Sequence, residues 1–333
     1  MRIAFITPSF FGYEEAIAQA FRDRGIDVDR FDERPSNSAI SRAVLRVMPQ
    51  FAARRLRGHF DRMLQQMRGR RYDALLIIKG ENLPPSVLRE FSEQNPEAVR
   101  IFYTFDSLAN SGRCVDLFPD TDVRYSFDRG DVAARGDLTY KSLFFAREFA
   151  EARGRAREFD ASFVGTLHSD RYNFFHGVVS KLSPERCFAF FYSQARWFFA
   201  LQRVFDRRMR KVAPGEVSFD KMSRARVAEV FGASRAVVDY QRPGQDGLTM
   251  RTFEALGSGA ALITANQSIL AEEFYDPSRI LVVPRDAASI DGEAVREWVA
   301  ALDDDWSFEG FDQYRIDSWI DDFLRDVDAG RNR

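Results

Sequence analysis

Short apolar runs alternate with helical patterns along most of this chain, and this alternation restricts the possible folds more than any other feature. Residues 74–78 form a continuous apolar run, typical of a strand buried on both faces of a parallel sheet. Four further strands are predicted in the first part of the chain, at residues 3–6, 26–31, 99–105 and 123–127. The segments between them favour helices, at residues 14–24, at 38–69 and from Pro84 onward.

A second alternating series begins near Asp160. Its predicted strands are residues 161–164, 187–192, 236–239, 260–264 and 280–283. Helices are predicted at residues 197–211, 223–231 and 249–256. Strands that alternate with helices indicate parallel sheets. Because a charged stretch at residues 147–159 divides the two series, the chain is predicted to be α/β with two Rossmann-like domains.

The predicted domain limits are residues 1–150, residues 158–310 and a C-terminal segment, 311–333. The last segment contains an amphipathic helix whose apolar residues form one stripe: Ile316, Trp319, Ile320, Phe323, Leu324 and Val327. We expect this stripe to pack against another part of the chain, and the first domain is the candidate.

Composition excludes several classes of protein. The formal net charge is -2, which argues against a globally basic protein that binds nucleic acid. The two cysteines exclude a disulfide scaffold, and with three histidines they argue against a zinc site. No run of 18 apolar residues is present, and the first apolar run ends at Pro8, so neither a transmembrane helix nor a signal peptide is expected. A cytoplasmic location is the default expectation.

The most informative motif lies at residues 245–259, between a predicted strand and a helix. A glycine-containing turn at a helix N-terminus, here with Gly247 and Leu248, suits a phosphate because its backbone N–H groups are available and the helix dipole favours an anion. Thr249 and Thr252 could add hydroxyl donors and Arg251 a positive charge, while the Glu254 carboxylate could accept hydrogen bonds from a ribose. The alternative is an ordinary capped helix with a surface glutamate.

A second candidate turn follows the strand predicted at residues 161–164. Ligands bind at the carboxyl ends of strands in doubly wound sheets, and Gly165 permits close approach of a ligand to the backbone. Thr166 belongs to the same turn, and Arg171 could reach a diphosphate. The alternative is a plain turn in which Asp170 and Arg171 form a solvent-exposed pair.

Three acidic residues follow predicted strands of the first domain: Glu14, Glu81 and Asp106. Each could take the proton of an acceptor hydroxyl, and each could instead cap a helix. The run Asp303-Asp304-Asp305 follows a helix rather than a nucleotide-binding strand, so we interpret it as a cap and predict no metal site.

Asp246 and Glu254 are separated by seven residues and followed by Gly-Ser-Gly and an apolar run. This pattern resembles the acid-x7-Glu motif of GT-B glycosyltransferases, with Asp where many members have Glu. More specifically, the chain resembles the CgeB-like family of bacterial glycosyltransferases found with lipopolysaccharide and capsule genes. The stretches that carry the resemblance are residues 32–37, 79–81, 103–107 with Asn110, 125–128, 163–166 with Asp170 and Arg171, and 247–254.

The resemblance implies a GT-B-like fold, in which two Rossmann-like domains face a cleft. The second domain would bind a nucleotide-diphosphate sugar, with UDP as the expected nucleotide, through Gly165, Thr166, Arg171, Gly247, Leu248, Thr249, Arg251, Thr252 and Glu254. The first would bind a saccharide or lipid-linked saccharide acceptor for surface polysaccharide synthesis. No cofactor is expected, and positive groups with the helix N-terminus would stabilise the leaving diphosphate, which makes a metal unnecessary. The alternatives are a non-catalytic protein that binds a nucleotide sugar or sugar, and a periplasmic-type binding protein.

Two stretches interleave basic and apolar residues, at 42–71 and 196–211. Such faces suit an anionic membrane surface or a phosphorylated lipid acceptor. Solvated crossover helices are the alternative. The first stretch, which carries nine arginines, is the one on which we base the expectation of peripheral attachment to the inner face of the cytoplasmic membrane.

Overall fold

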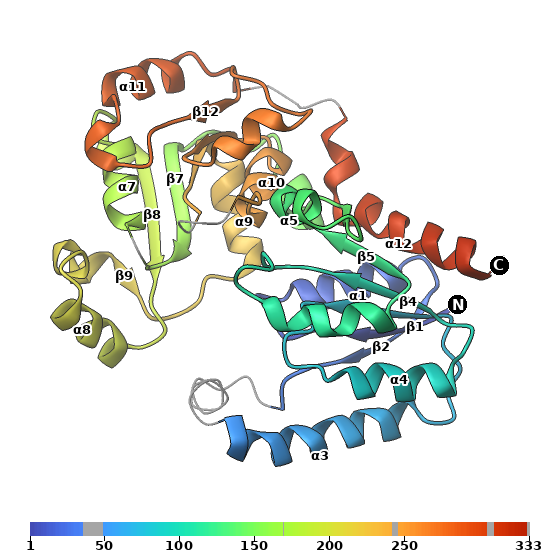
Figure 1. Cartoon of the computed structure of the whole chain (residues 1–333). Helices are drawn as coiled ribbons and strands as arrows, with labels where there is room; N and C mark the ends of the chain where they lie inside the picture. The colour runs from blue at the N-terminus through green and yellow to red at the C-terminus, as the bar shows by residue number, and fades with distance from the viewer. Residues whose placement is uncertain (36–48, 169, 242–245, 305–309, 332–333) are drawn as a thin grey trace. The chain divides into compact units, whose positions relative to one another are not determined.

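The computed structural model describes residues 1–35, 49–168, 170–241, 246–304 and 310–331. The chain divides into two compact units (Figure 1). Unit 1 combines Met1–Ser142 with Ile316–Arg333, and unit 2 is Leu143–Arg315. Each unit is built on one parallel six-stranded sheet with helices packed against it, so each is described separately.

The sheet of unit 1 has the order β2-β1-β3-β4-β5-β6. Its strands are β1 (Arg2–Ile6), β2 (Asp27–Phe31), β3 (Ala74–Ile78), β4 (Val99–Tyr103), β5 (Val123–Ser126) and β6 (Thr139–Tyr140). Its helices are α1 (Tyr13–Arg22), α3 (Pro49–Met67), α4 (Pro85–Gln94), the 3-10 helix η1 (Gly112–Asp120), α5 (Arg129–Ala134) and α12 (Ile316–Arg331). The 38–69 helix expected from the sequence thus corresponds to α3, and its first part lies outside the described residues.

Helices cover both faces of this sheet, and Figure 1 shows α3 and α4 on one face and α1 and α12 on the other. Strand β3 is buried along its whole length, as its apolar run predicts. The four described apolar residues of α3 that reach the core are Phe60, Met63, Leu64 and Met67. They pack with β1 and β3 residues on the α3–α4 face.

The C-terminal helix α12 belongs to unit 1. Its Trp319 ring lies 5.2 Å from the Tyr103 ring of β4, and the indole N–H donates to the Ser142 carbonyl at 2.8 Å. Lys141, which is buried, forms an ion pair with Asp322. The apolar stripe read from the sequence is therefore the face that covers β4, and it explains why the last segment of the chain joins the first unit.

The sheet of unit 2 has the order β12-β11-β10-β7-β8-β9. Its strands are β7 (Phe159–Thr166), β8 (Cys187–Tyr192), β9 (Val217–Ser218), β10 (Ser234–Asp239), β11 (Ala261–Thr264) and β12 (Ile280–Val282). Its α-helices are α6 (Arg147–Glu151), α7 (Arg171–Val178), α8 (Arg196–Phe205), α9 (Arg224–Gly232), α10 (Met250–Gly257) and α11 (Gly292–Ala300).

Shorter 3-10 helices connect these elements: η2 (Pro184–Arg186), η3 (Met209–Lys211), η4 (Pro214–Glu216), η5 (Gln267–Ala271), η6 (Ala287–Ser289) and η7 (Phe311–Tyr314). The expected helix 197–211 is thus α8 followed by a separate 3-10 turn. The two-residue strands β6 and β9 were not predicted, because so short a segment carries no periodicity.

The division between the units falls at Ser142, before the charged stretch that marked the expected boundary at residue 150. The reason is apolar packing. Phe145 lies against Gly257 and stacks on Phe311 at 5.7 Å, and Phe149 lies 6.0 Å from Phe231, all within unit 2. The aromatic residues before α6 and within it therefore fix the boundary, and the charges that follow them do not.

Candidate functional site

Unit 2 has a topological switch point between β7 and β10. From β7 the chain continues through β8 to β9 on one side, and from β10 it continues through β11 to β12 on the other. In sheets of this kind the space outside the carboxyl ends of the two central strands is where ligands bind. The turn before α10 follows β10, as predicted. Gly165 and Thr166, predicted to form a turn after a strand ending at residue 164, are instead the last two residues of β7 and pair with Phe191 and Tyr192 of β8. Both segments therefore lie at the same carboxyl edge of one sheet.

Arg171, the first residue of α7, connects the ends of these two strands. Its Nε donates to the Tyr240 carbonyl at 3.0 Å and its Nη1 to the Thr166 carbonyl at 3.1 Å. A Cβ at Gly165 would lie 2.9 Å from Cζ of Phe163 and 3.4 Å from Nη1 of Arg171, so a side chain there would displace the ring. The guanidinium therefore places a fixed positive charge at the switch point.

The start of α10 is tied to the end of β10 by a buried carboxylate, Asp239. Thr249 is the N-cap of α10: its Oγ1 accepts from the Arg251 N–H at 3.1 Å and donates to Asp239 Oδ2 at 2.9 Å. The Thr252 hydroxyl donates to the same oxygen at 3.4 Å. Burial raises the pKa of Asp239, while the Thr249 hydrogen bond and the nearby Arg171 charge lower it.

Sequence reasoning assigned the two threonine hydroxyls to a phosphate, whereas in this structure both donate to Asp239. The remaining feature that would attract an anion to this end of α10 is the helix dipole. Asp239 was missed because a single acid at the end of a strand gives no signal by itself. Its partners come from the next helix, 10 and 13 residues further along the chain.

Glu254 is buried in α10 and ion-paired within the helix. Its Oε2 lies 2.7 Å from Nη1 of Arg251, and only 3% of its side chain is exposed. Burial raises the pKa of Glu254 to about 8 and lowers that of Arg251 to about 10. The Arg251 guanidinium also lies over the Phe231 ring, at 5.0 Å from its centre. This excludes the alternative of an exposed surface glutamate.

Gly247 and Leu248 form the turn before α10, and Leu248 is buried. The turn is held from β11 by Asn266, whose side-chain N–H groups donate to the Asp246 and Gly247 carbonyls at 3.3 Å each. Asn266 is itself buried. Sequence reasoning missed it, because an Asn after a strand is indistinguishable from any turn residue.

Unit 1 has an equivalent switch point between β1 and β3. Two non-glycine residues in the described part of the chain have positive φ, and each follows one of these two strands: Phe11 (54°) and Lys79 (75°). At Gly80, with φ of 65°, a Cβ would lie 2.7 Å from Leu117 Cδ1. Left-handed backbone outside glycine is costly and concentrates at functional sites, so this edge is the candidate functional edge of unit 1.

Two of the three predicted acids meet at this edge. Lys79 Nζ lies 3.4 Å from Asp106 Oδ2 and 3.9 Å from Glu81 Oε1, and Arg34 Nη2 lies 3.7 Å from Glu81 Oε2. Glu81 and Asp106 keep about a third of their side chains exposed (30% and 37%). Both can therefore touch a ligand.

Glu14, the third predicted acid, has a different environment. Its carboxylate accepts from the backbone N–H of Phe10 at 2.9 Å, and the residue is 9% exposed. It therefore fixes the loop between β1 and α1. Within the residues that the structure describes, no hydrogen bond or ion pair joins Glu14 to Glu81 or Asp106.

Glu33, which follows β2, is a fourth acid at this edge and was missed as a site candidate. It is fully buried; Oε1 accepts from the Asn82 amide at 3.2 Å, and Oε2 has no hydrogen-bond partner within the described residues. Burial raises the pKa of Glu33 to about 7, partly offset by Arg34. Two signals were available, its position two residues after β2 and its place in the stretch 32–37 that carries the resemblance, and neither indicates that the side chain is buried.

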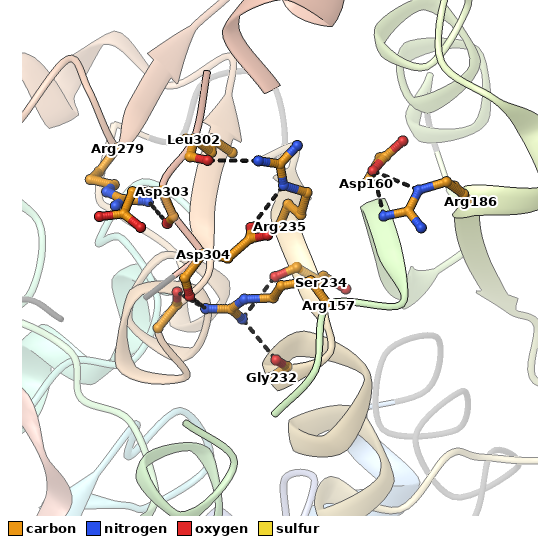
Figure 2. A network of polar contacts seen from close by, with 11 residues as sticks. Arg157, Asp160, Arg186, Gly232, Ser234, Arg235, Arg279, Leu302, Asp303 and Asp304 are labelled. Atoms are coloured by element: carbon orange, nitrogen blue, oxygen red, sulfur yellow. Dashed lines mark hydrogen bonds and ion pairs between the residues drawn. The ribbon is translucent and has the colours of Figure 1, made fainter. Parts of the chain in front are cut away.

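The Asp303-Asp304 pair lies at the opposite edge of the unit 2 sheet, where the strands begin. Asp304 forms an ion pair with Arg235 at 2.8 Å, and the neighbouring Arg157 donates to the Gly232 and Ser234 carbonyls at 2.7 and 3.0 Å (Figure 2). The Asp304 carboxylate thus contacts the start of β10, and the Asp303 backbone carbonyl accepts from Arg279, just before β12, at 2.8 Å. The described part of this run connects strand starts and does not cap α11, whose C-cap is Ala301. In the described residues, no group of three or more His, Cys, Asp or Glu residues is placed to hold a metal ion.

Comparison with known proteins bears on this site. A family model described as "Glycosyl transferase-like" matches residues 194–305, which include β10, the Gly247 turn and α10. No curated protein sequence matches the chain.

In the part of the chain that the structure describes, no helix is long and apolar enough to cross a membrane.

The whole chain is similar in fold to several solved structures. Anabaena HepE, solved with UDP and glucose, is 13% identical with a TM-score of 0.60, over 98% of this chain and 99% of that one. AviGT4, a glycosyltransferase of avilamycin A biosynthesis, is 14% identical with a TM-score of 0.64, over 100% and 98%. The UDP-GlcNAc 2-epimerase of Methanocaldococcus jannaschii, solved with UDP-GlcNAc and UDP, is 10% identical with a TM-score of 0.57, over 98% and 99%.

The chain therefore has an α/β fold of the GT-B type, with two Rossmann-like units. At these identities the likeness concerns the fold alone, and the same fold serves a transferase and an epimerase. A particular activity therefore depends on the residues at the two switch points.

Proposed function

We propose that this protein is a glycosyltransferase that moves a sugar from a nucleotide-diphosphate sugar to a saccharide or lipid-linked saccharide acceptor. The observation that carries the proposal is the arrangement in unit 2 of Arg171 and the N-terminus of α10 at one switch point. A fixed cation and a helix N-terminus at the carboxyl edge of a parallel sheet suit a diphosphate. The family-model match over residues 194–305 supports transfer over the other activities of the fold.

In this proposal the diphosphate lies between the end of β7, at Gly165 and Thr166, and the turn at Gly247 and Leu248. Glu254, in the second turn of α10, is the acid that would accept the ribose hydroxyls, as the resemblance to GT-B enzymes implies. Its ion pair with Arg251 would fix the direction of the carboxylate. Anabaena HepE was solved with UDP, which supports UDP as the nucleotide to test first.

We assign the acceptor to the switch point of unit 1. A hydroxyl nucleophile needs a carboxylate within hydrogen-bond reach to take its proton. Asp106 and Glu81 are the exposed acids there, and Lys79 lies between them as a cation that can orient both. Glu14 would act by holding the loop after β1. Glu33 joins the set as a buried acid beside Asn82.

Departure of the nucleoside diphosphate would be stabilised electrostatically. Charge develops on the leaving phosphate oxygen, and a preorganised cation with a helix dipole can stabilise it without further reorganisation. Arg171 supplies the cation and α10 the dipole. For this reason we propose transfer without a metal ion.

A cytoplasmic location and a role in bacterial surface polysaccharide synthesis complete the proposal. The role follows from the resemblance to the CgeB-like family, and the location is the default expectation from the sequence. An acceptor carried on a lipid would require work near a membrane.

The decisive experiment incubates the protein with a panel of nucleotide sugars and measures release of the nucleoside diphosphate, with and without saccharide acceptors. Turnover with one donor supports the proposal. Asp106→Asn should then lower turnover about a hundredfold or more while calorimetric binding of UDP is unchanged. Glu90→Gln, on α4, is the control. Donor binding without turnover under all conditions would instead favour a non-catalytic nucleotide-sugar-binding protein, and interconversion of free UDP-sugars would favour an epimerase.

A further inference from the structure

Helix α8 exposes a continuous apolar face. Trp197 is 70% exposed, Leu201 47%, Val204 61% and Phe205 80%. Their spacing, i, i+4, i+7 and i+8, places them on one side of the helix, and Phe198, 37% exposed, borders them. Five of the eight large hydrophobic side chains that are exposed in the described chain thus lie on this one ten-residue helix.

The fold of unit 2 does not require this face. The helix is attached through its opposite side, where buried Phe199 lies 6.2 Å from the Phe219 ring. Its C-terminus is fixed by Arg210, whose guanidinium donates to the Arg203 and Val204 carbonyls at 3.1 and 2.8 Å. Figure 1 shows α8 projecting from the β8–β9 side of unit 2. A stable helix that exposes several large apolar side chains to solvent indicates a binding surface.

The charges around this face select the kind of partner. The helix contains Arg196 and Arg203 and no acidic residue, and the exposed residues Arg207, Arg208 and Lys211 follow within two turns. Arg208 pairs with Asp170 at 3.2 Å, and the Arg196 guanidinium lies over the Phe219 ring at 4.8 Å. A second copy of the chain would bring two cationic faces together. An anionic lipid bilayer offers acyl chains to the apolar face and negatively charged headgroups to its basic border.

We infer that α8 is a membrane-docking helix that lies in the interface of an anionic phospholipid bilayer, with the side chains of Trp197, Leu201, Val204 and Phe205 inserted among the acyl chains. An amphipathic helix with aromatic residues on one face and basic residues beside it binds in this way. The inference goes beyond sugar transfer and does not depend on it. It also moves the expected attachment away from residues 42–71, because Phe60, Met63, Leu64 and Met67 of α3 pack in the core of unit 1.

The test is co-sedimentation of the full chain with vesicles of phosphatidylcholine alone and of phosphatidylcholine mixed with phosphatidylglycerol, each at low and high salt. We expect pelleting with the anionic vesicles, weakened by salt. Trp197→Ser with Phe205→Ser should reduce the partition coefficient about tenfold or more for each residue. Leu270→Ser, at a side chain exposed elsewhere in unit 2 (51%), is the matched control and should leave the coefficient unchanged.

The basic border is tested separately with Arg203→Gln and Arg207→Gln, against Arg226→Gln on α9 as the charge control. We expect the first pair to lose binding and its dependence on salt, and the control to keep both. The inference would be overturned if the parent protein pelleted with neither lipid. It would also be overturned if the Trp197→Ser, Phe205→Ser variant pelleted to the same extent as the parent protein. A concentration-dependent dimer that the variant abolishes would overturn it as well, since a second copy would then cover α8. UDP binding by the variants, measured in parallel, separates this outcome from failure of the proposed transferase.

Discussion

Thr249 donates its hydroxyl hydrogen to the buried Asp239 carboxylate at 2.9 Å, and this bond joins the end of β10 to the start of α10. The same hydroxyl caps the helix by accepting from the Arg251 N–H. One side chain therefore sets both the position of the helix N-terminus and its distance from the strand. In the proposed function this geometry aims the helix dipole at the diphosphate.

Replacing Thr249 with Ala should destabilise the protein by about 1–3 kcal/mol, because the variant loses a helix cap and leaves a buried carboxylate with one fewer donor. Denaturant unfolding measures the loss, and hydrogen exchange of α10 amides locates it. Ser223→Ala removes the N-cap of α9, which accepts from the Arg226 N–H and is not tied to Asp239. That control should cost about 1 kcal/mol and leave UDP affinity unchanged. Equal UDP affinity in both variants would contradict a role for Thr249 in shaping the site.

Glu254→Ala should weaken UDP binding by about 1–3 kcal/mol, the range for losing a hydrogen bond to a charged group. Isothermal calorimetry measures the affinity for UDP and for ribose diphosphate, which lacks the uracil base. The ion pair is a complication, since the variant also leaves Arg251 without its carboxylate. Arg251→Gln is therefore the partner variant, because it removes the guanidinium and keeps the carboxylate. If both variants lose the same affinity, Glu254 acts only through Arg251, and if neither loses any, it lies outside the site.

All strands of both sheets except the two-residue β6 and β9 could be predicted from the sequence, most clearly where burial on two faces leaves an apolar run, as in β3 and β10. The two unit 2 turns could be placed at one edge because parallel strands end on the same side. The helix stripe through Trp319 and Phe323 was visible as a pattern, whereas its partner, Tyr103 of β4, was not. Periodicity identifies a buried face and carries no information about the face opposite.

The residues that sequence reasoning missed act through long-range contacts. Asn266 reaches back 19 and 20 residues to the Gly247 turn, and Glu33 meets Asn82 across 49 residues. Glu33 lies in the stretch 32–37 that carries the resemblance, but neither position has a local pattern that predicts its partner. The threonines of α10 were identified correctly as hydroxyls at a helix start, but their partner, Asp239, becomes apparent only when β10 is placed beside them.

Turnover should persist in the presence of a chelator. The proposed site supplies its positive charge through Arg171, which is held by the Tyr240 and Thr166 carbonyls, and through the α10 dipole. The measurement is the rate of UDP release from the preferred donor after dialysis against EDTA, with and without added magnesium or manganese. Loss of activity in EDTA and recovery with a divalent ion would show that electrostatic stabilisation by the protein alone is insufficient.

Glu33 should make the protein less stable as the pH rises. Its pKa is about 7 in the folded protein and 4.5 in an unperturbed chain, so between these values the folded state holds the proton and the unfolded state releases it. The free energy of unfolding then falls with increasing pH across this window, by about 3 kcal/mol in total. Arg34, Lys79 and Glu81 surround the carboxyl and act on its ionisation, Arg34 and Lys79 by favouring it and Glu81 by opposing it.

Glu33→Gln should remove this dependence. The amide oxygen can still accept from Asn82, and the side chain no longer ionises in a buried position, so the variant should gain up to about 3 kcal/mol of stability above pH 8 and little at pH 5. Urea unfolding at both pH values measures the difference, with Glu90→Gln as the control for removing one negative charge. A variant that is less stable than the parent at high pH would show that the ionised carboxylate is satisfied in the folded protein. If the stabilised variant also loses turnover while binding UDP normally, the unfavourable burial of this acid is retained for catalysis, as expected where stability and activity conflict.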